Sequence, residues 1–268
     1  MRRLALLAIV GVVGACTFVT TLDGLRGGAS DAGAPDGASI DGSADAPSPC
    51  DPGPTADLVG YYRFDEGSGT VARDCSGKGH DGTVLRVGPS TWGAGVKGGG
   101  LRVVAPDGCV ELPASADFEM KSGLTAMAWV YVNAYPPTPT LLAIVGKSVD
   151  LAVAGWRVYS AVVEELGTAV ARPGDAGLLY ASIEPVASKT WHHVAARYEP
   201  GKSEIFYVDG VEVSNRTWTT ALLEDKPAHV RLGCRGDNAG FFDGTIDEVR
   251  IYARALTPTE IAILSAKP

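Results

Sequence analysis

Short hydrophobic stretches alternate with clusters of glycine, proline and aspartate from about residue 58 to the C-terminus. The stretches are rich in β-branched and aromatic residues, which favour strands over helices. Thirteen candidate strands follow from this pattern: 58–64, 82–87, 100–104, 109–112, 124–132, 140–146, 151–159, 178–184, 191–199, 203–208, 211–213, 230–233 and 245–252. Many short strands separated by turn residues predict an all-β sandwich or barrel.

Two short motifs predict local structure within this pattern. Asp209-Gly210 lies between the apolar stretches 206–208 and 211–213, and this dipeptide suits the two positive-φ positions of a type I′ hairpin turn. Thr257 is followed by Pro258 and, three residues on, by Glu260, which together form a capping box with proline in the first turn. We therefore expect one short C-terminal helix packed on the sandwich.

The stretch 124–132 is apolar on both faces of the strand that it predicts. One face carries Leu124, Ala126, Ala128, Val130 and Val132, and the other carries Met127, Trp129 and Tyr131. A sandwich buries only one face of each sheet. The second face is therefore either covered by a loop or forms an aromatic floor for a sugar ring.

The segment 27–57 has a different composition, dominated by glycine, alanine, serine, proline and aspartate, with no aromatic residue and no lysine or arginine. Such a segment cannot bury enough apolar surface to offset its chain entropy. We expect a flexible acidic tether over residues 16–56 and a folded domain over 57–268. A coil of roughly 40 residues has an end-to-end distance of about 35 Å.

The N-terminus carries an export signal. Arg2 and Arg3 precede an apolar run of about eleven residues, too short for a membrane span that needs roughly 20. Small residues before Cys16 resemble a bacterial lipobox, which implies that a signal peptide, residues 1–15, is removed and that Cys16 is acylated. Thr17 after the cysteine resembles the sorting signal for the outer membrane. The alternative is an ordinary signal peptide with an incidental cysteine.

Assigning Cys16 to lipidation leaves four cysteines in an exported, oxidising setting. Four cysteines allow three pairings, and no Cys-x-x-Cys or Cys/His spacing indicates zinc. We favour the pairs Cys109–Cys234 and Cys50–Cys75. The second pair would close a loop of about 25 residues and fix the end of the tether to the domain.

The formal net charge of −8 argues against nucleic acid as a partner, because phosphate binding needs a basic surface. Calcium or neutral sugars suit an acidic protein better. From residue 58 onward, 20 basic and 24 acidic side chains leave a charge of only −4, so half of the acidity belongs to the N-terminal part.

Six stretches of the predicted domain occur in a characteristic order. They are 58–69, 74–82, 126–130, 191–195, 206–210 and 244–256. Together they resemble laminin G-like jelly-roll domains of the concanavalin A-like lectin/glucanase superfamily. The resemblance covers essentially all of 57–268 and implies a two-sheet antiparallel jelly-roll sandwich with a short C-terminal helix. The cysteines at 75, 109 and 234 look like additions to the family pattern.

The resemblance implies a site for structural Ca²⁺ near the loop 74–82 and the last strand. The ligands would be the side chains of Asp65, Asp74, Asp81 and Asp247 with the carbonyls of Gly77 and Gly79. Calcium takes six to eight oxygen ligands, which aspartates and a glycine-rich loop can supply. The alternative is that these aspartates only cap turns.

Catalysis is not expected. Glucanases of this superfamily carry two carboxylates on one face of a strand, whereas the acidic pairs here are sequence neighbours: Asp65-Glu66, Glu164-Glu165 and Asp247-Glu248. On a regular strand, neighbouring side chains point to opposite faces. His192 and His193 likewise cannot share a metal, and Arg235-Gly236-Asp237 reads as a turn.

We therefore expect an exported bacterial lipoprotein at the outer membrane or cell surface, which binds carbohydrate or a cell-surface protein without catalysis. The alternatives are a structural or adhesion spacer, and a glycosidase or lyase of the same fold. The sequence does not choose among five candidate ligand contacts: Met127, Trp129, Tyr131, Trp156 and Arg157.

Overall fold

The structure is a computed structural model that describes residues 50, 53–89, 91–120, 122–135, 142–147, 156–161, 165–171, 178–180, 186–217, 228–237 and 240–268. Within 156–180 it describes the strand backbone only. Cys16, the signal peptide and most of the predicted tether lie outside the described residues. Residues 45–268 belong to one compact unit.

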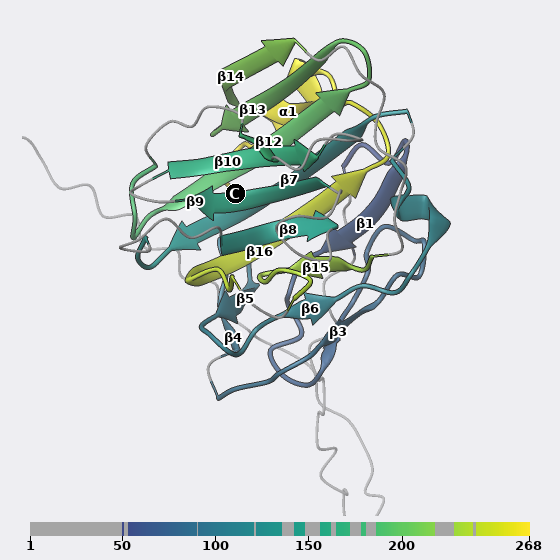
Figure 1. Cartoon of the computed structure of the whole chain (residues 1–268). Helices are drawn as coiled ribbons and strands as arrows, with labels where there is room; N and C mark the ends of the chain where they lie inside the picture. The colour runs from purple at the N-terminus through teal and green to yellow at the C-terminus, as the bar shows by residue number, and fades with distance from the viewer. Residues whose placement is uncertain are drawn as a thin grey trace, which may run out of the picture. The chain divides into compact units, whose positions relative to one another are not determined.

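The described strands form two antiparallel sheets of eight strands each, which lie one over the other as two layers (Figure 1). Sheet A has the order β14 (Val211–Thr217), β13 (Ser203–Val208), β12 (Trp191–Glu199), β7 (Leu124–Val132), β16 (Gly244–Tyr252), β5 (Gly99–Val103) and β4 (Trp92–Ala94), with β1 (Leu58–Tyr62) paired to β16. Sheet B has the order β11 (Leu178–Tyr180), β10 (Glu165–Ala171), β9 (Trp156–Ala161), β8 (Leu142–Lys147), β15 (Val230–Leu232), β6 (Val110–Glu111), β3 (Gly82–Val84) and β2 (Val71–Ala72).

The predicted sandwich is confirmed, and so is the short C-terminal helix α1 (Pro258–Leu264) with its capping box between Thr257 and Glu260. A short 3₁₀ turn, η1 (Ala116–Phe118), lies between β6 and β7. Strands β2, β4 and β10 were not predicted. The first two have only two and three residues, too few to show a period of two.

The main core fills the space between the sheets. Alternate residues of β7, from Leu124 to Val132, belong to it, together with Ile144 and Val145 of β8. This face of β7 is the one that the alternation predicts.

The opposite, outer face of β7 is covered for part of its length. Met127 lies in a second apolar cluster with Tyr61, Leu256 and Ile261, the last from α1. The cover is therefore the C-terminal helix and the segment before it rather than an internal loop. Of the two interpretations of this face, burial is confirmed for Met127.

A β-bulge interrupts β16 between Asp247 and Arg250, and Glu248 has a positive φ of 51°. Ile246 and Val249 both belong to the core between the sheets, so two residues stand between them instead of one. The expectation that Asp247 and Glu248 point to opposite faces is therefore wrong. The extra residue lets both side chains leave the core.

Both predicted disulfides are present. Cys50 is bonded to Cys75, with a Cα–Cα distance of 5.5 Å, and Cys109 to Cys234, with a distance of 5.4 Å. The first bond joins the N-terminal segment to the loop after β2. A hydrogen bond from the Tyr252 hydroxyl to the Pro54 carbonyl also holds this segment on the domain. Contacts with the sandwich thus begin before residue 57. Among the described residues, no helix is long and apolar enough to cross a membrane.

Candidate functional site

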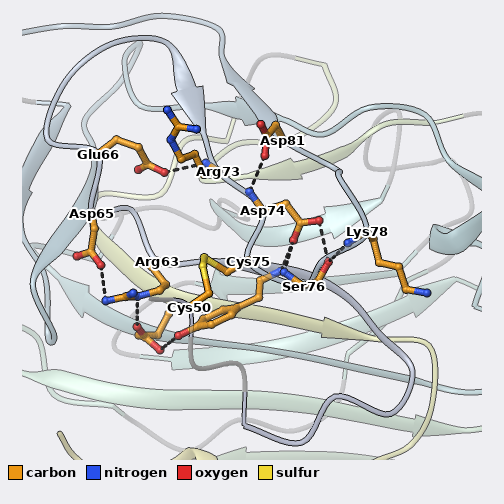
Figure 2. The surroundings of a disulfide bond; sticks show 12 residues. Cys50, Arg63, Asp65, Glu66, Arg73, Asp74, Cys75, Ser76, Lys78 and Asp81 are labelled. Carbon is orange, nitrogen blue, oxygen red and sulfur yellow. Dashed lines mark hydrogen bonds and ion pairs between the residues drawn. A yellow bond between two sulfur atoms is a disulfide. The ribbon is translucent and has the colours of Figure 1, made fainter. Parts of the chain in front are cut away.

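The loop 74–82 is organised by the carboxylate of Asp74 (Figure 2). Its Oδ1 accepts the backbone N–H groups of Tyr61 and Ser76, at 3.0 and 2.8 Å. Its Oδ2 accepts the Ser76 hydroxyl at 2.7 Å and the His80 N–H at 2.9 Å. Asp81 completes the loop, because its Oδ1 accepts the Asp74 N–H at 2.8 Å. Four donors thus converge on one carboxylate and hold the loop against β1.

Two glycines of this loop, Gly77 and Gly79, have φ values of 82° and 77° and form exposed turns. These conformations cost glycine little and other residues more. The neighbouring Cys75 is bonded to Cys50, so the loop also holds the N-terminal segment (Figure 2).

Asp65 and Asp247 lie at a different place, around the turn between β4 and β5. Asp65 Oδ1 accepts the Gly99 N–H at 2.7 Å, and its Oδ2 lies 2.6 Å from the Arg63 guanidinium. Asp247 is fully buried, and its Oδ2 accepts the Lys97 N–H at 3.0 Å. Burial raises the pKa of the Asp247 carboxyl to about 8.

The four aspartates among the six predicted calcium ligands therefore fall into two groups, and each of their carboxyl groups accepts at least one N–H group. Within the described part of the chain, no three His, Cys, Asp or Glu side chains are grouped so that they could hold a metal ion. Carboxylate lone pairs that already accept N–H groups are poor ligands for a cation that needs six to eight oxygens. The residues in this arrangement do not fit the ion, and calcium stays a prediction.

The bulge in β16 builds a buried cluster of charges on the outer face of sheet A. Glu248 Oε2 accepts the Tyr61 hydroxyl at 2.7 Å and the Arg250 Nη2 at 2.8 Å. The Arg63 Nε lies 3.7 Å from Glu248 Oε1, and the Arg250 guanidinium stacks 4.0 Å from the centre of the Tyr61 ring. Two guanidiniums thus compensate the charge of Glu248.

Trp129 lies beside this cluster and contacts the buried His193 of β12. The two rings meet edge to face with centroids 5.5 Å apart. Neither ring nitrogen of His193 has a hydrogen-bond partner among the described residues. Burial, with a smaller effect of Arg250, lowers the pKa of His193 to about 3. The imidazole is therefore neutral in the folded domain at neutral pH.

An open pocket of about 200 Å³ lies between this cluster and the C-terminal helix. We call it the helix pocket. Its lining combines one indole, two cationic groups, the carboxylate of Glu248 and residues of the C-terminal segment up to the terminal Pro268: Gly53, Lys97, Trp129, Glu248, Arg250, Ile263, Leu264, Ala266 and Pro268.

A row of partly exposed side chains crosses the same face two residues further along β7. Trp191 pairs with Tyr131, Tyr131 with Thr245, and Thr245 with Arg102, so the four side chains lie on one face of four adjacent strands. The rings of Trp191 and Tyr131 have centroids 5.7 Å apart. We call this set the aromatic row. At about 4.8 Å between strands it spans about 14 Å.

Comparison with known proteins shows to which family the chain belongs. Residues 105–262, more than half of the chain, match the family model Laminin_G_3, described as the concanavalin A-like lectin/glucanases superfamily. The chain belongs to this superfamily. No curated protein matches the sequence.

Several solved structures resemble this concanavalin A-like domain. Domain 4 of AbnA, a GH43 extracellular arabinanase from Geobacillus stearothermophilus in complex with arabinotriose, is 20% identical with a TM-score of 0.59; the match covers 78% of this chain and 98% of that one. The binding domain of Paraclostridial Mosquitocidal Protein 1 is 18% identical, with a TM-score of 0.58 and coverage of 78% and 52%. A sialidase from Trypanosoma rangeli is 17% identical, with a TM-score of 0.57 and coverage of 79% and 33%.

These similarities establish the fold alone. This chain spans about half of the mosquitocidal binding domain and a third of the sialidase, so it corresponds to only part of each. The neighbours include binding domains as well as an enzyme.

The five predicted ligand contacts of the concanavalin A-like domain differ in burial and in the sheet to which they belong. Met127 is fully buried and Trp129 is 4% exposed, whereas Tyr131 is partly exposed. Trp156 and Arg157 lie in β9 of sheet B, where only the backbone is described.

Other residues with potential chemistry have structural partners in the domain. His192 Nδ1 lies 2.7 Å from Asp209 Oδ2, beside the hairpin turn, while His193 packs on Trp129. The side chains of Arg235 and Asp237 pair with each other at 2.9 Å.

Sequence reasoning missed Lys97, Trp191 and Arg250 as site residues. The spacing of the apolar residues Ile246 and Val249, three apart within a strand, was the signal that could have indicated the bulge and hence the cluster around Arg250.

Proposed function

We propose that the chain is a surface-tethered, non-catalytic binding module whose concanavalin A-like domain takes carbohydrate on the aromatic row. The observation that carries the proposal is the pair of adjacent, partly exposed rings of Trp191 and Tyr131. Aromatic faces supply apolar contact area for sugar rings, and flanking polar groups fix orientation. Thr245 and the exposed Arg102 continue the row and offer a hydroxyl and a guanidinium.

The arabinanase domain supports a sugar as ligand, since it shares the fold over nearly its whole length and was solved with arabinotriose. A row of about 14 Å would accommodate a short oligosaccharide of this kind. A protein partner is the second candidate, because the mosquitocidal neighbour is itself a binding domain.

A hydrolase is disfavoured by the state of the acidic groups on this face. Glycosidases need two carboxyl groups open to substrate on either side of the scissile bond. Asp247 is fully buried and Glu248 is 4% exposed, with both carboxylates engaged by N–H or O–H donors. These two residues would stabilise the sandwich rather than act on a substrate.

Attachment to the membrane would come from Cys16, with residues 16–56 as the tether. Two disulfides are typical of proteins in oxidising compartments, which supports export. A Cys16→Ser variant should therefore lose lipid labelling and leave the membrane fraction. Retention of the label would contradict the assignment.

A glycan array with the compact unit 45–268, which retains Cys50, tests the proposed function. We expect binding to a subset of glycans that Trp191→Ala and Tyr131→Ala each weaken at least about tenfold, the loss expected when an aromatic contact is removed. Trp92→Ala is the matched control, because Trp92 is also partly exposed but packs against the core between the sheets. Absence of binding across plant, bacterial and animal glycans would favour a spacer or a protein partner, and release of sugar from a bound glycan would favour an enzyme.

A further inference from the structure

We propose that Asn133 and Asp243 bind adjacent hydroxyl groups of an uncharged sugar ring that stacks on Tyr131. This assignment rests on the proposed function, because the ring belongs to the glycan that lies on the aromatic row. The two residues would supply polar contacts that the row itself lacks at this end of β7.

The two side chains lie at the end of the ladder between β7 and β16. The Asn133 N–H donates to the Asp243 carbonyl at 2.9 Å, directly after the last residue pair of these two strands. Val132 and Phe242 belong to the core between the sheets. Because side chains alternate along a strand, the residue after each of them points away from this core, as Tyr131 does. Asn133 and Asp243 therefore adjoin the aromatic row.

A hydrogen bond aligns the amide with the carboxylate. Asn133 Nδ2 donates to Asp243 Oδ1 at 3.0 Å, and both residues are partly exposed. This bond uses only one of the two amide hydrogens and one of the two carboxylate oxygens. Among the described residues, neither side chain has a further polar partner. The remaining amide hydrogen, amide oxygen and carboxylate oxygen are therefore available to hydroxyl groups on neighbouring carbons of one ring.

The charges at this place favour an uncharged ring. Thr245 pairs with Tyr131 on one side and with Arg102 on the other, and Asp243 precedes Thr245 by two residues. The carboxylate of Asp243 and the exposed guanidinium of Arg102 thus adjoin the same residue, and neither forms an ion pair within the described part of the chain. A carboxylate on the sugar would be repelled by Asp243. Hydroxyl groups, in contrast, can donate to the carboxylate and accept from the guanidinium.

The chain offers a matched control for these two residues. In β14, Asn215 Nδ2 donates to Glu212 Oε1 at 2.9 Å, so the same two functional groups are paired there. This pair is exposed at the edge of sheet A, with β13 and β12 between it and β7. Its loss should leave binding on the aromatic row unchanged.

Trisaccharides and their methyl ethers test the inference. We would measure by calorimetry the affinity of the unit 45–268 for trisaccharides of arabinose, xylose, glucose, mannose and galactose, and for neutral glycans that bind on the array. Methylation of the hydroxyl groups should weaken the binding of each bound sugar at least about tenfold, as expected when charge-assisted hydrogen bonds are lost. Asp243→Asn and Asn133→Ala should each weaken the unmodified sugar about tenfold and change the affinity for its methyl ether little. Glu212→Gln should preserve both affinities.

The outcomes separate this inference from the proposed function. Unchanged affinity in Asp243→Asn and Asn133→Ala, or equally tight binding of the methyl ethers, would overturn the assigned contacts. Binding confined to acidic glycans would overturn the uncharged class of sugar. In each of these cases carbohydrate binding on the row stands if Trp191→Ala weakens it. If neither the trisaccharides nor any glycan of the array binds, the proposed function fails and the assigned contacts fail with it. A thermal melt of each variant checks that a loss of affinity is not a loss of folding.

Discussion

Ionisation of Asp247 should destabilise the domain as the pH rises. Its pKa is raised by burial to about 8, against an ordinary value of 3.8. Between these two values the folded chain holds a proton that the unfolded chain has released. The free energy of unfolding contributed by this group is thus fully present below about pH 4 and is lost as the pH rises through 8.

The magnitude follows from the same two pKa values. Each pKa unit corresponds to ~1.4 kcal/mol, so the contribution should fall by about 4 kcal/mol between about pH 5 and pH 9. The wild-type curve alone would show only the part of this loss above about pH 6.5. His193 has a pKa lowered to about 3 from an ordinary value of 6.5, so its contribution is present above 6.5 and lost as the pH falls toward 3. The two groups oppose each other between about pH 4 and 6.5.

The contribution of His193 cancels in the difference between the free energies of unfolding of the wild type and Asp247→Asn, because both proteins contain this histidine. An amide keeps one oxygen acceptor, so one of the N–H groups of Lys97 and Glu248 loses its partner, at a cost of about 1–3 kcal/mol that does not depend on pH. Urea denaturation followed by tryptophan fluorescence should show the wild type more stable than the variant at about pH 5. The gap should shrink by about 4 kcal/mol, and the order can reverse, by about pH 9. A gap that stays constant over this range would refute the raised pKa of Asp247.

Three further predictions concern what holds the domain together. Replacing the disulfide Cys109–Cys234 by serines should lower the free energy of unfolding by ~5 kcal/mol in urea denaturation, because its cysteines are 125 residues apart. Removal of Cys50–Cys75, whose cysteines are 25 residues apart, should cost ~3.5 kcal/mol. A smaller loss for Cys109–Cys234 than for Cys50–Cys75 would contradict the explanation by loop entropy. Thr257→Ala should cost about 1 kcal/mol in the same assay through loss of the helix cap, while Thr257→Ser should be nearly neutral. A chelator should leave the melting temperature unchanged, because hydrogen-bond donors already hold the carboxylate of Asp74; a clear fall would show that calcium stabilises the domain.

The fold could be predicted from sequence because its signals are local and repeated. Alternating apolar residues in the stretch 124–132 specify a strand in the sandwich, and Thr257, Pro258 and Glu260 specify the helix start within four residues. The number of disulfides also followed from counting, once Cys16 was assigned elsewhere, although counting left three possible pairings. Each of these inferences needs only neighbouring residues or the number of cysteines.

The site could be predicted only in part: Tyr131 was among the candidate contacts, but the charge cluster beside the aromatic row depends on one irregular residue. A regular strand would direct Asp247 and Glu248 to opposite faces, so their carboxyl groups could not belong to the same site. The bulge with φ of 51° at Glu248 changes the alternation and allows Glu248 to meet Tyr61 and Arg250 on the outer face. A backbone conformation of this kind is fixed by tertiary packing, which the order of polar and apolar residues records only as a changed spacing.

The length of the C-terminal helix explains why the outer face of sheet A is buried at one end and partly exposed at the other. A strand of nine residues such as β7 is about 30 Å long, whereas a helix of seven residues is about 10 Å long and about 10 Å wide. Such a helix can cover only about a third of the strand. It buries Met127, borders the helix pocket at Trp129 and leaves Tyr131 partly exposed. The helix therefore accounts for the apolar character of the second face of β7 at Met127, whereas Tyr131 and the neighbouring Trp191 stay partly exposed, as the proposed carbohydrate site requires.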